Sequence, residues 1–407
     1  MAYVAVRGGQ EAIEASLELL AWERVKSGRT VEVKDMMAAF PDLIDQVMGE
    51  SSLYAPELAA LALKQAQGSC EEAVFLLRAF RSTLERPFVS RTTESGEMQV
   101  LRRISAAFKD IPGGQILGAT RDYSHRLIDF SLRKEDNDTV CELRKKMKQD
   151  GKEELKAEKA EKAEKASGLK KEHTQPTEFG MSEAPVGGKA ATSVDRLPKV
   201  TDYLRKQKLL VEHARDDTPP VDITMEPLVF PVPRSARLQT LTRGMTQAVN
   251  ALGYAAIRGF GPEHPTVAEV RYGNIEIAID HPLGKESDAG EAYYLGSVPV
   301  TEVESLFEVE AAAKSSGGLK ELAFDLGYGM VIGRAETKAI AMSVLDNCLN
   351  RGDKRFPTQD EEFVLYHVDG VEATGFISHL KLPHYVTFQS KLSSVRKTKG
   401  GADGAAL

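Results

Sequence analysis

Two histidines near the end of the chain have a spacing suited to metal ligands. His379 and His384 flank four residues in SHLKLPHYVTF, and Pro383 directly precedes the second histidine. Imidazole nitrogen binds divalent zinc, rings three to five residues apart can reach one ion, and the proline places His384 in a non-helical turn. No cysteine lies near in sequence, and two ligands do not complete a site. The pair is therefore either part of a zinc site or two half-buried histidines bonded to backbone groups.

A basic cluster between residues 101 and 130 is suited to anions. It surrounds a Pro-Gly-Gly turn whose bare backbone could approach a ligand, and its cationic side chains are Arg102, Arg103, Lys109, Arg121 and Arg126. Guanidinium forks and exposed turn amides are the groups that polyphosphate recognition requires. The alternative is a solvated basic loop. The chain has no GxxxxGK[S/T] pattern, and its first glycine pair lacks the spacing of a dinucleotide-binding turn.

A second basic cluster and an acidic run follow in the C-terminal half. FPVPRSARLQTLTRG places Arg234, Arg237 and Arg243 after an extended, proline-rich entry, which favours either anion binding or surface salt bridges. QDEEFVLYH carries Glu361 and Glu362 upstream of the paired histidines. A carboxylate can act as a general base or stabilise positive charge at a sugar carbon, as cleavage of an N-glycosidic bond requires. Alternatively, these acidic residues only favour the dipole at a helix N-terminus.

The N-terminal part of the chain, residues 1–132, is expected to be mainly helical. A short β-prone run at residues 3–6 precedes apolar residues at helical spacing that continue until Gly28. Another helix should begin at Pro56 and end before Gly68, and a third should follow from residue 70. The third has an apolar face and a basic face, made of Ala73, Val74, Leu77, Phe80 and Leu84 and of Arg78, Arg81 and Arg86, respectively. The last two segments predict a helical hairpin.

Residues 133–194 are expected to be a charged, low-complexity linker or insertion. The run KEELKAEKAEKAEKA repeats Ala, Glu and Lys without an apolar stripe, so it could form a solvated helix through Glu–Lys pairs worth about 0.2–0.5 kcal/mol each but has nothing to bury. A run rich in Pro, Gly, Ser and Thr follows, as is typical of flexible linkers. Glutamate nearly balances lysine here, which disfavours binding to nucleic acid.

Residues 195–390 show a mixed pattern. Residues 270–280 alternate apolar and polar positions as a half-buried strand does, and residues 327–333 form a strand-like run bounded by glycines. A helix should follow and end at Gly352. The fold class is therefore α+β, with a helical N-terminal part, the charged insertion, this mixed α/β part, and a frayed tail at residues 391–407.

Composition excludes several classes of protein. The chain has 407 residues, 42% of them hydrophobic, and its 33 glycines show no triplet period, which excludes fibrous and wholly disordered proteins. Its 53 Lys+Arg against 60 Asp+Glu give a net charge of −7, which argues against a nucleic-acid coat protein. Its three cysteines are too far apart for a zinc knuckle or disulfide framework, and we see neither a secretory leader nor an apolar stretch of roughly 18 residues. We therefore expect a cytoplasmic protein that is not in the membrane.

Five segments, in this order, resemble the PhnI subunit of the carbon-phosphorus lyase system. They are residues 57–84, 102–130, 233–244, 327–346 and 359–389. The resemblance covers about residues 1–132 and 195–390, whereas the Lys/Glu-rich stretch between them looks like an expansion of a less charged connection in the family.

The resemblance implies a nucleosidase-type activity. PhnI-like proteins, with partner subunits, displace adenine from MgATP with a phosphonate to give alpha-D-ribose 1-methylphosphonate 5-triphosphate. Alone, the family is associated with release of the base from purine nucleoside triphosphates. The implied partners are PhnG-, PhnH- and PhnJ-like subunits and a PhnL-like ATPase-type protein. By the same resemblance, His379 and His384 bind zinc at the boundary with the PhnJ-like subunit.

This activity requires groups that the clusters could supply. The triphosphate and phosphonate would be held by Arg102, Arg103, Lys109, Arg234, Arg237 and Arg243. The candidate carboxylates for assisting departure of the base are Glu361, Glu362 and Asp122, with Asp110 as a further one, and the sequence does not rank them. The alternative is a non-catalytic scaffold that positions partner subunits and completes an interfacial zinc site.

Overall fold

The computed structural model describes residues 9–148, 197–214, 218–260, 264–283, 292–314 and 320–399. By their contacts the residues form two compact units, one of residues 1–115 with 194–407 and one of residues 116–193. The compositional division at residues 132, 194 and 390 stays a prediction. The β-prone run at residues 3–6 and the Ala/Glu/Lys repeat lie outside the described residues.

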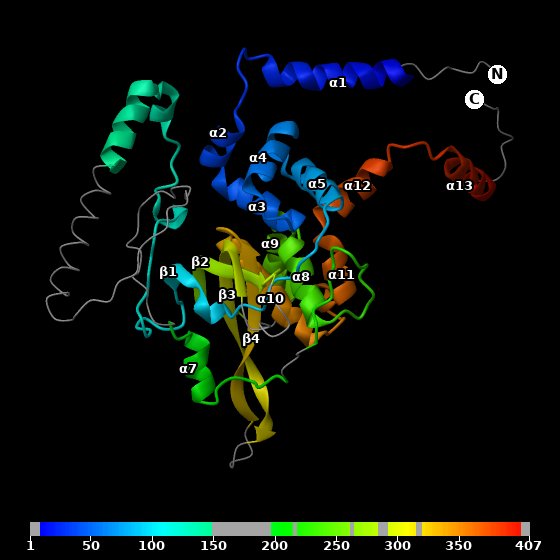
Figure 1. Cartoon of the computed structure of the whole chain (residues 1–407). Helices are drawn as coiled ribbons and strands as arrows, with labels where there is room; N and C mark the ends of the chain where they lie inside the picture. The colour runs from blue at the N-terminus through cyan, green and yellow to red at the C-terminus, as the bar shows by residue number, and fades with distance from the viewer. Residues whose placement is uncertain are drawn as a thin grey trace. The chain divides into compact units, whose positions relative to one another are not determined.

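A four-stranded antiparallel sheet is the centre of the larger unit (Figure 1). Its strands are β1 (Gln99–Ile104), β2 (Thr266–Asp280), β3 (Ala292–Lys314) and β4 (Lys320–Ile332), and they pair in sequence order. The predicted strands at residues 270–280 and 327–333 are confirmed as parts of β2 and β4. Together with the helices, the sheet confirms the α+β class.

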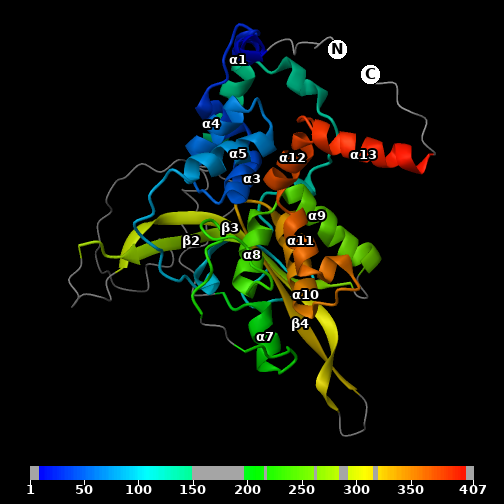
Figure 2. The same ribbon diagram turned by 90° about the vertical axis from the view of Figure 1, so that its right-hand side faces the viewer.

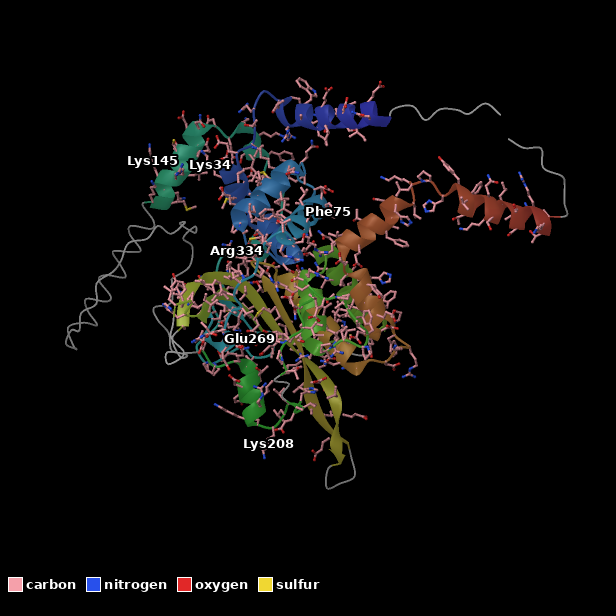
Figure 3. All side chains as sticks on the ribbon, turned by 45° about the vertical axis from the view of Figure 1, so that its right-hand side comes forward. Lys34, Phe75, Lys145, Lys208, Glu269 and Arg334 are labelled. Atoms are coloured by element: carbon pink, nitrogen blue, oxygen red, sulfur yellow. The ribbon has the colours of Figure 1, made fainter. Side chains whose placement is uncertain are left out.

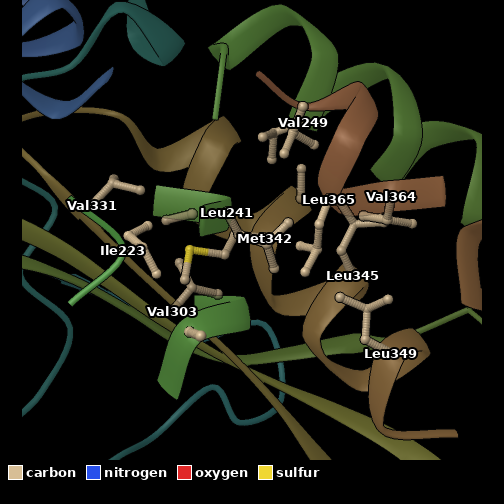
Figure 4. Packing of buried hydrophobic residues seen from close by; sticks show 14 of the residues in the cluster. Ile223, Leu241, Val249, Val303, Val331, Met342, Leu345, Leu349, Val364 and Leu365 are labelled. Carbon is tan, nitrogen blue, oxygen red and sulfur yellow. The ribbon is translucent and has the colours of Figure 1, made fainter. Parts of the chain in front are cut away.

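One face of the sheet is covered by helices (Figure 2). Helices α10 (Glu336–Arg351) and α8 (Arg234–Arg243) pack on it directly, while α9 (Thr246–Ala255) packs on α10 and α11 (Glu361–His367) packs on α8. Figure 4 shows the apolar core that results, in which strand residues such as Val303 and Val331 meet Leu241, Met342 and Leu345 of the helices. Gly352 ends α10 with φ 64°, as predicted from its position.

Two glycines of β4 allow α10 to lie directly against the strand. A Cβ atom at Gly327 would collide with the carbonyl oxygen of Ser343, and one at Gly329 with that of Ala339. The GYG sequence thus places two bare positions on the face that meets the helix, since alternate strand residues share a face. The close approach brings the polar side chains of α10 to the edge of the sheet.

A second core lies among the N-terminal helices of this unit. It joins α2 (Val33–Ala39), α3 (Pro41–Ser51), α4 (Pro56–Gln65) and α5 (Cys70–Arg81). The predicted α4–α5 hairpin is confirmed, and Ala73, Val74 and Leu77 are buried as expected. Phe80 and Leu84 are exposed, however, because α5 ends at Arg81 and its last turn extends beyond the core. The first predicted helix is also confirmed, as α1 (Gly9–Val25), although none of its residues is buried.

Shorter elements complete the described residues. The larger unit has the 3-10 turns η1 (Ser95–Glu97) and η6 (Pro357–Gln359), the π-helix η4 (Ala256–Phe260), α7 (Val200–Lys206) and α12 (Gly370–His379). The smaller unit has η2 (Arg121–Tyr123), η3 (Phe130–Lys134) and helical residues 137–148. Helix α13 spans Tyr385–Thr398, so the frayed tail expected from residue 391 is helical up to that point. No helix among the described residues is long and apolar enough to cross a membrane.

The close packing of α10 on β4 makes a stability prediction. Gly329→Ala should destabilise the protein by about 2–3 kcal/mol, because the added methyl group forces the helix away from the strand. Urea unfolding of the purified protein measures the change. Gly375→Ala in α12 is the matched control: nothing lies within 4 Å of its new Cβ, and it should be neutral or slightly stabilising. Equal stabilities for the two variants would contradict the packing argument.

Candidate functional site

The paired histidines lie next to each other at the junction of α12 and α13. His379 is the last residue of α12, His384 directly precedes α13, and their ring centroids are 5.4 Å apart. The Nδ1 atoms lie 2.5 Å from the carbonyl oxygen of Phe376 and 2.6 Å from that of Leu382, respectively. A carbonyl oxygen can only accept, so each Nδ1 carries the proton. In the neutral ring, Nε2 then keeps the lone pair that a metal ion requires.

The surface around this pair is strongly apolar. Of its residues, Phe376 is 69% exposed, Tyr385 73% and Val386 87%, and Ile377, Leu380, Leu382 and Phe388 are also exposed. Both rings are bonded to backbone groups, as one of the two interpretations of the sequence expected. The same interpretation expected both rings to be half-buried, and this holds for His379 but not for His384, which is exposed. No group of three or more His, Cys, Asp or Glu residues in the described part of the chain could hold a metal ion. Any metal on the pair would need ligands from elsewhere.

The acidic run forms the start of α11. Asp360 accepts a hydrogen bond from the N–H of Phe363 at 3.2 Å and is the N-cap. Glu361 accepts one from the N–H of Val232 at 2.8 Å, which ties α11 to the segment before α8. Glu362 is exposed in the first turn. The helix-terminus interpretation is therefore confirmed for this run, while any catalytic role stays a prediction.

Arg102 and Arg103 lie on β1 and are buried, not in a solvated loop. Nε of Arg102 lies 2.5 Å from the carboxylate of Glu336. Arg103 is 0% exposed, forms an ion pair with Glu269 (labelled in Figure 3), and donates to the carbonyl oxygens of Pro112 and Pro198 at 2.6 and 2.8 Å. Both guanidinium groups are thus committed to partners within the unit.

The turn after β1 packs against the buried side chain of Arg103. A Cβ at Gly113, whose φ is 84°, would collide with Leu197 and lie 3.2 Å from Nη1 of Arg103. The bare backbone that could have approached a ligand instead makes room for these two side chains. Lys109, by contrast, is exposed. Asp122 belongs to the smaller unit, where it is exposed and paired with Arg126 at 3.1 Å.

A buried charge network continues from Arg103 across the sheet. Arg271 of β2 donates through Nε to Glu302 of β3 at 2.9 Å, and Nζ of Lys199 lies 2.8 Å from Glu302 and 3.1 Å from Glu304. Tyr328 of β4 also donates to Glu302, at 3.1 Å. Burial alone would raise the pKa of Glu302, but the charges of Arg271 and Lys199 outweigh it and hold the pKa at about 2.

Arg234 and Arg237 pack against the end of α10. Arg234 forms an ion pair with Asp346, which is 0% exposed, and this carboxylate also accepts the N–H of Tyr328 at 3.0 Å. Arg237 donates to the side-chain oxygen of Asn350 at 2.8 Å. The alternative of salt bridges is confirmed for Arg234, although its partner is buried.

Arg243 lies in a different environment, at the end of α8, beside Asp369 and Arg78, to which the sequence assigned no function. Nη2 of Arg243 is 3.8 Å from Asp369, which Arg78 of α5 holds at 2.8 Å. The signal was present in the sequence as the basic face of α5, but only the fold brings that face to α8. The predicted arginines therefore divide among the sheet interior, the end of α10 and this cluster.

Comparison with known proteins gives the class. Residues 2–402 match the family of PhnI, a bacterial phosphonate metabolism protein. The chain is 39% identical to a putative C-P lyase subunit protein, HtxH, of Stutzerimonas stutzeri, over 99% of this chain and 97% of that protein. It is 38% identical to the alpha-D-ribose 1-methylphosphonate 5-triphosphate synthase subunit PhnI of Escherichia coli (strain K12), over 97% of this chain and 98% of the relative. For the subunit of the same name from Rhizobium meliloti (strain 1021) the identity is 36%, over 99% and 96%.

The chain is thus related over its whole length to proteins of bacterial phosphonate metabolism. It belongs to the PhnI family, as the resemblance of its five segments predicted.

The charge network predicts a specific loss of stability in acid. Because the pKa of Glu302 is about 2 in the folded protein and ordinary in the unfolded chain, its contribution is present above about pH 5 and is lost as the pH falls toward 2. Relative to Glu302→Gln, the native protein should lose about 1 kcal/mol between pH 6 and 4 and about 2 kcal/mol by pH 3. Urea unfolding across this range measures it. Glu276→Gln, at an exposed position of β2, should keep the native pH dependence, and a Glu302→Gln profile parallel to the native one would contradict the assignment.

Proposed function

We propose that this chain is a nucleosidase-type subunit of a carbon-phosphorus lyase complex. In this role it displaces adenine from MgATP with a phosphonate and gives alpha-D-ribose 1-methylphosphonate 5-triphosphate. The reaction would take place in the cytoplasm with PhnG-, PhnH-, PhnJ- and PhnL-like partners, and magnesium would enter with the nucleotide. The observation that carries the proposal is the nearly full-length similarity to two proteins named as subunits of the synthase for this product.

The proposed chemistry assigns separate tasks to the chain's side chains. The triphosphate must be held, the base must be protonated or hydrogen-bonded as it departs, and positive charge at the sugar carbon must be stabilised. Lys109 is exposed, and Arg234 keeps 46% of its side chain exposed while it holds Asp346, so both could contact a phosphate from the solvent side without breaking a pair. Arg237 and Arg243 are partly buried on α8 and could contribute from there. Arg102 and Arg103 would contribute by fixing the fold around the site.

The candidate carboxylates differ in their availability. Glu362 is exposed, whereas Glu361 already holds the N–H of Val232. Glu362 is therefore the better candidate for assisting departure of the base, since a general acid or base must reach the reacting atom. Asp122 remains a further candidate, on the smaller unit.

The paired histidines suit zinc as the two ligands that this chain would supply. Both rings keep Nδ1 protonated against a carbonyl, which orients Nε2 in the way that ligand histidines are commonly oriented. Zinc at this point would hold a partner subunit or polarise a substrate oxygen. His379 and His384 would supply two ligands, and a PhnJ-like partner or water would supply the rest.

A second candidate function, a scaffold, is favoured by the apolar surface around the histidines. Large exposed apolar patches mark interaction sites, and here the patch surrounds an incomplete ligand set. A scaffold of this kind would position partner subunits and complete an interfacial zinc site, with catalysis at a shared surface.

Release of adenine separates the two functions. The purified chain, alone and then with its co-purified partner subunits, is incubated with MgATP and methylphosphonate, and free adenine is measured by chromatography. We expect adenine to be released from the chain alone and more rapidly from the complex, because the partners complete the site. Release only with partners would favour the scaffold, and no release from either preparation would reject the proposed reaction.

Zinc content tests the metal site. His379→Ala and His384→Ala should each remove most of the zinc from the co-purified complex, because each substitution removes one of four ligands. The measurement is metal content per complex by mass spectrometry. His367→Ala is the matched control, since Nδ1 of His367 is likewise 2.7 Å from a backbone carbonyl oxygen, that of Phe363. Unchanged zinc in both ligand variants would reject the assignment.

A further inference from the structure

Four arginines gather where α5, α8 and α12 meet. Arg78 and Arg81 lie on α5, Arg86 follows it, and Arg243 ends α8; we refer to these residues as the α5 arginine cluster. Each interacts electrostatically with at least one other member. Nothing in the family relationship assigns a role to Arg78, Arg81 or Arg86.

Several of the cluster's hydrogen bonds hold helix ends together. Arg78 donates through Nε and Nη2 to the carbonyl oxygen of Glu50 at 3.0 and 2.9 Å, and Arg81 donates to that of Ser51 at 2.5 Å. Arg243 donates to the carbonyl oxygen of Ile223 at 2.9 Å. Arginines that cap helix C-termini are common, and capping alone is the structural explanation of the cluster.

Capping does not account for the excess of positive charge. Arg78 holds Asp369 in a salt bridge, Arg86 holds Asp222, and the charge of Glu372 acts on Arg243, so three carboxylates act on four guanidinium groups. In the described part of the chain Arg81 makes its one hydrogen bond to a neutral carbonyl, and Arg243 reaches Asp369 only at 3.8 Å. The nearby carboxylate of Glu50 accepts hydrogen bonds from Thr246 at 2.8 Å, and its charge acts on the buried ammonium of Lys338.

The like charges of the cluster act on the pKa of both Arg81 and Arg243. Burial lowers the pKa of Arg81, and the charges of Arg78 and Arg86 lower it further, with Asp222 acting in the opposite direction. Burial also lowers the pKa of Arg243, as do Arg78 and Arg81, with Asp369 and Glu372 acting in the opposite direction. Half-buried cations that disfavour one another gain from an added anion, because their interaction is less screened than in water.

We infer that the α5 arginine cluster is a binding site for a phosphorus oxyanion, either a phosphate group of a nucleoside triphosphate or a phosphonate. Arg81 and Arg243 would bind it through the guanidinium N–H groups that do not donate to backbone carbonyl oxygens. Arg78 and Arg86 would lie on either side of it, each held in place by its salt bridge to a carboxylate. A guanidinium fork matches the two oxygens of such a group. The choice of these two ligands rests on the proposed function, but the titration below measures binding and can fail or succeed independently of the reaction.

Calorimetric titration of the full chain with inorganic triphosphate and with methylphosphonate tests the site. Arg81→Gln should weaken binding of the oxyanion that occupies the site by about 10- to 100-fold, the effect of losing one charged hydrogen-bond donor. Arg81→Lys should be intermediate, because it keeps the charge but not the fork. The probe whose affinity falls identifies the source, the nucleotide or the phosphonate.

Controls separate binding from capping and from general charge. Arg205→Gln removes an exposed arginine paired with Asp202 on α7, and it should leave the affinities unchanged. If Arg81→Gln does not fold by circular dichroism, Arg86→Gln takes its place, since 47% of that side chain is exposed. Native affinity for both probes in a folded Arg81 or Arg86 variant would overturn the inference, as would no binding by the native chain or equal losses in Arg205→Gln.

Discussion

The structure depends on a requirement that buried charges be paired. Arg103, Arg271 and Lys199 enter the interior of the unit only because Glu269, Glu302 and Glu304 meet them there. Removing one partner of such a pair commonly costs several kcal/mol, since the other charge remains buried. The pairs connect β1 to β2 and β2 to β3, and Lys199 joins the start of α7 to β3. Strand order and the attachment of residues 197–206 are thereby specified together, because a one-residue slip would move each charge to the apolar face.

The opposite face of the sheet is stabilised by close apolar packing and not by ion pairs between strands. Val303 and Val331 meet Leu241 and Met342, and the glycines of β4 bring α10 close enough for its polar residues to reach the strand edge. Asp346 can then accept both the N–H of Tyr328 and the side chain of Arg234. One N–H group of the edge strand is thus satisfied by a side chain and is not available for pairing with another chain. The arginines of α8 owe their positions to this packing.

Local signals predicted local structure well. The helices that begin at Pro56 and Cys70 and the helix that ends at Gly352 have their caps in the sequence itself. The closeness of the His379 and His384 rings was also predictable, because it follows from their spacing of five positions and from the turn at Pro383. What failed was the environment of Arg102 and Arg103. Their neighbours in sequence indicated a basic loop, whereas the carboxylates that pair with them in the interior, Glu336 and Glu269, lie 234 and 166 positions away in the chain. Strands β1 and β3 escaped prediction for the same reason, because their charged residues are interior only in the presence of distant partners.

The same reasoning distinguishes the arginines that are available to a ligand from those that are not. A guanidinium group with a buried carboxylate of its own, such as Arg103 with Glu269, would have to break that pair before it could bind phosphate, and the carboxylate left behind would repel the ligand. A guanidinium group without an ion pair of its own, such as Arg81, on which two arginines act more strongly than Asp222 does, has no such pair to break, and an anion relieves its repulsion. Counting arginines in a sequence therefore overestimates the anion sites of a protein. The useful quantity is the number of carboxylates that the fold brings to each one, and by that measure the basic face of α5 is better suited to phosphate than the arginines of β1.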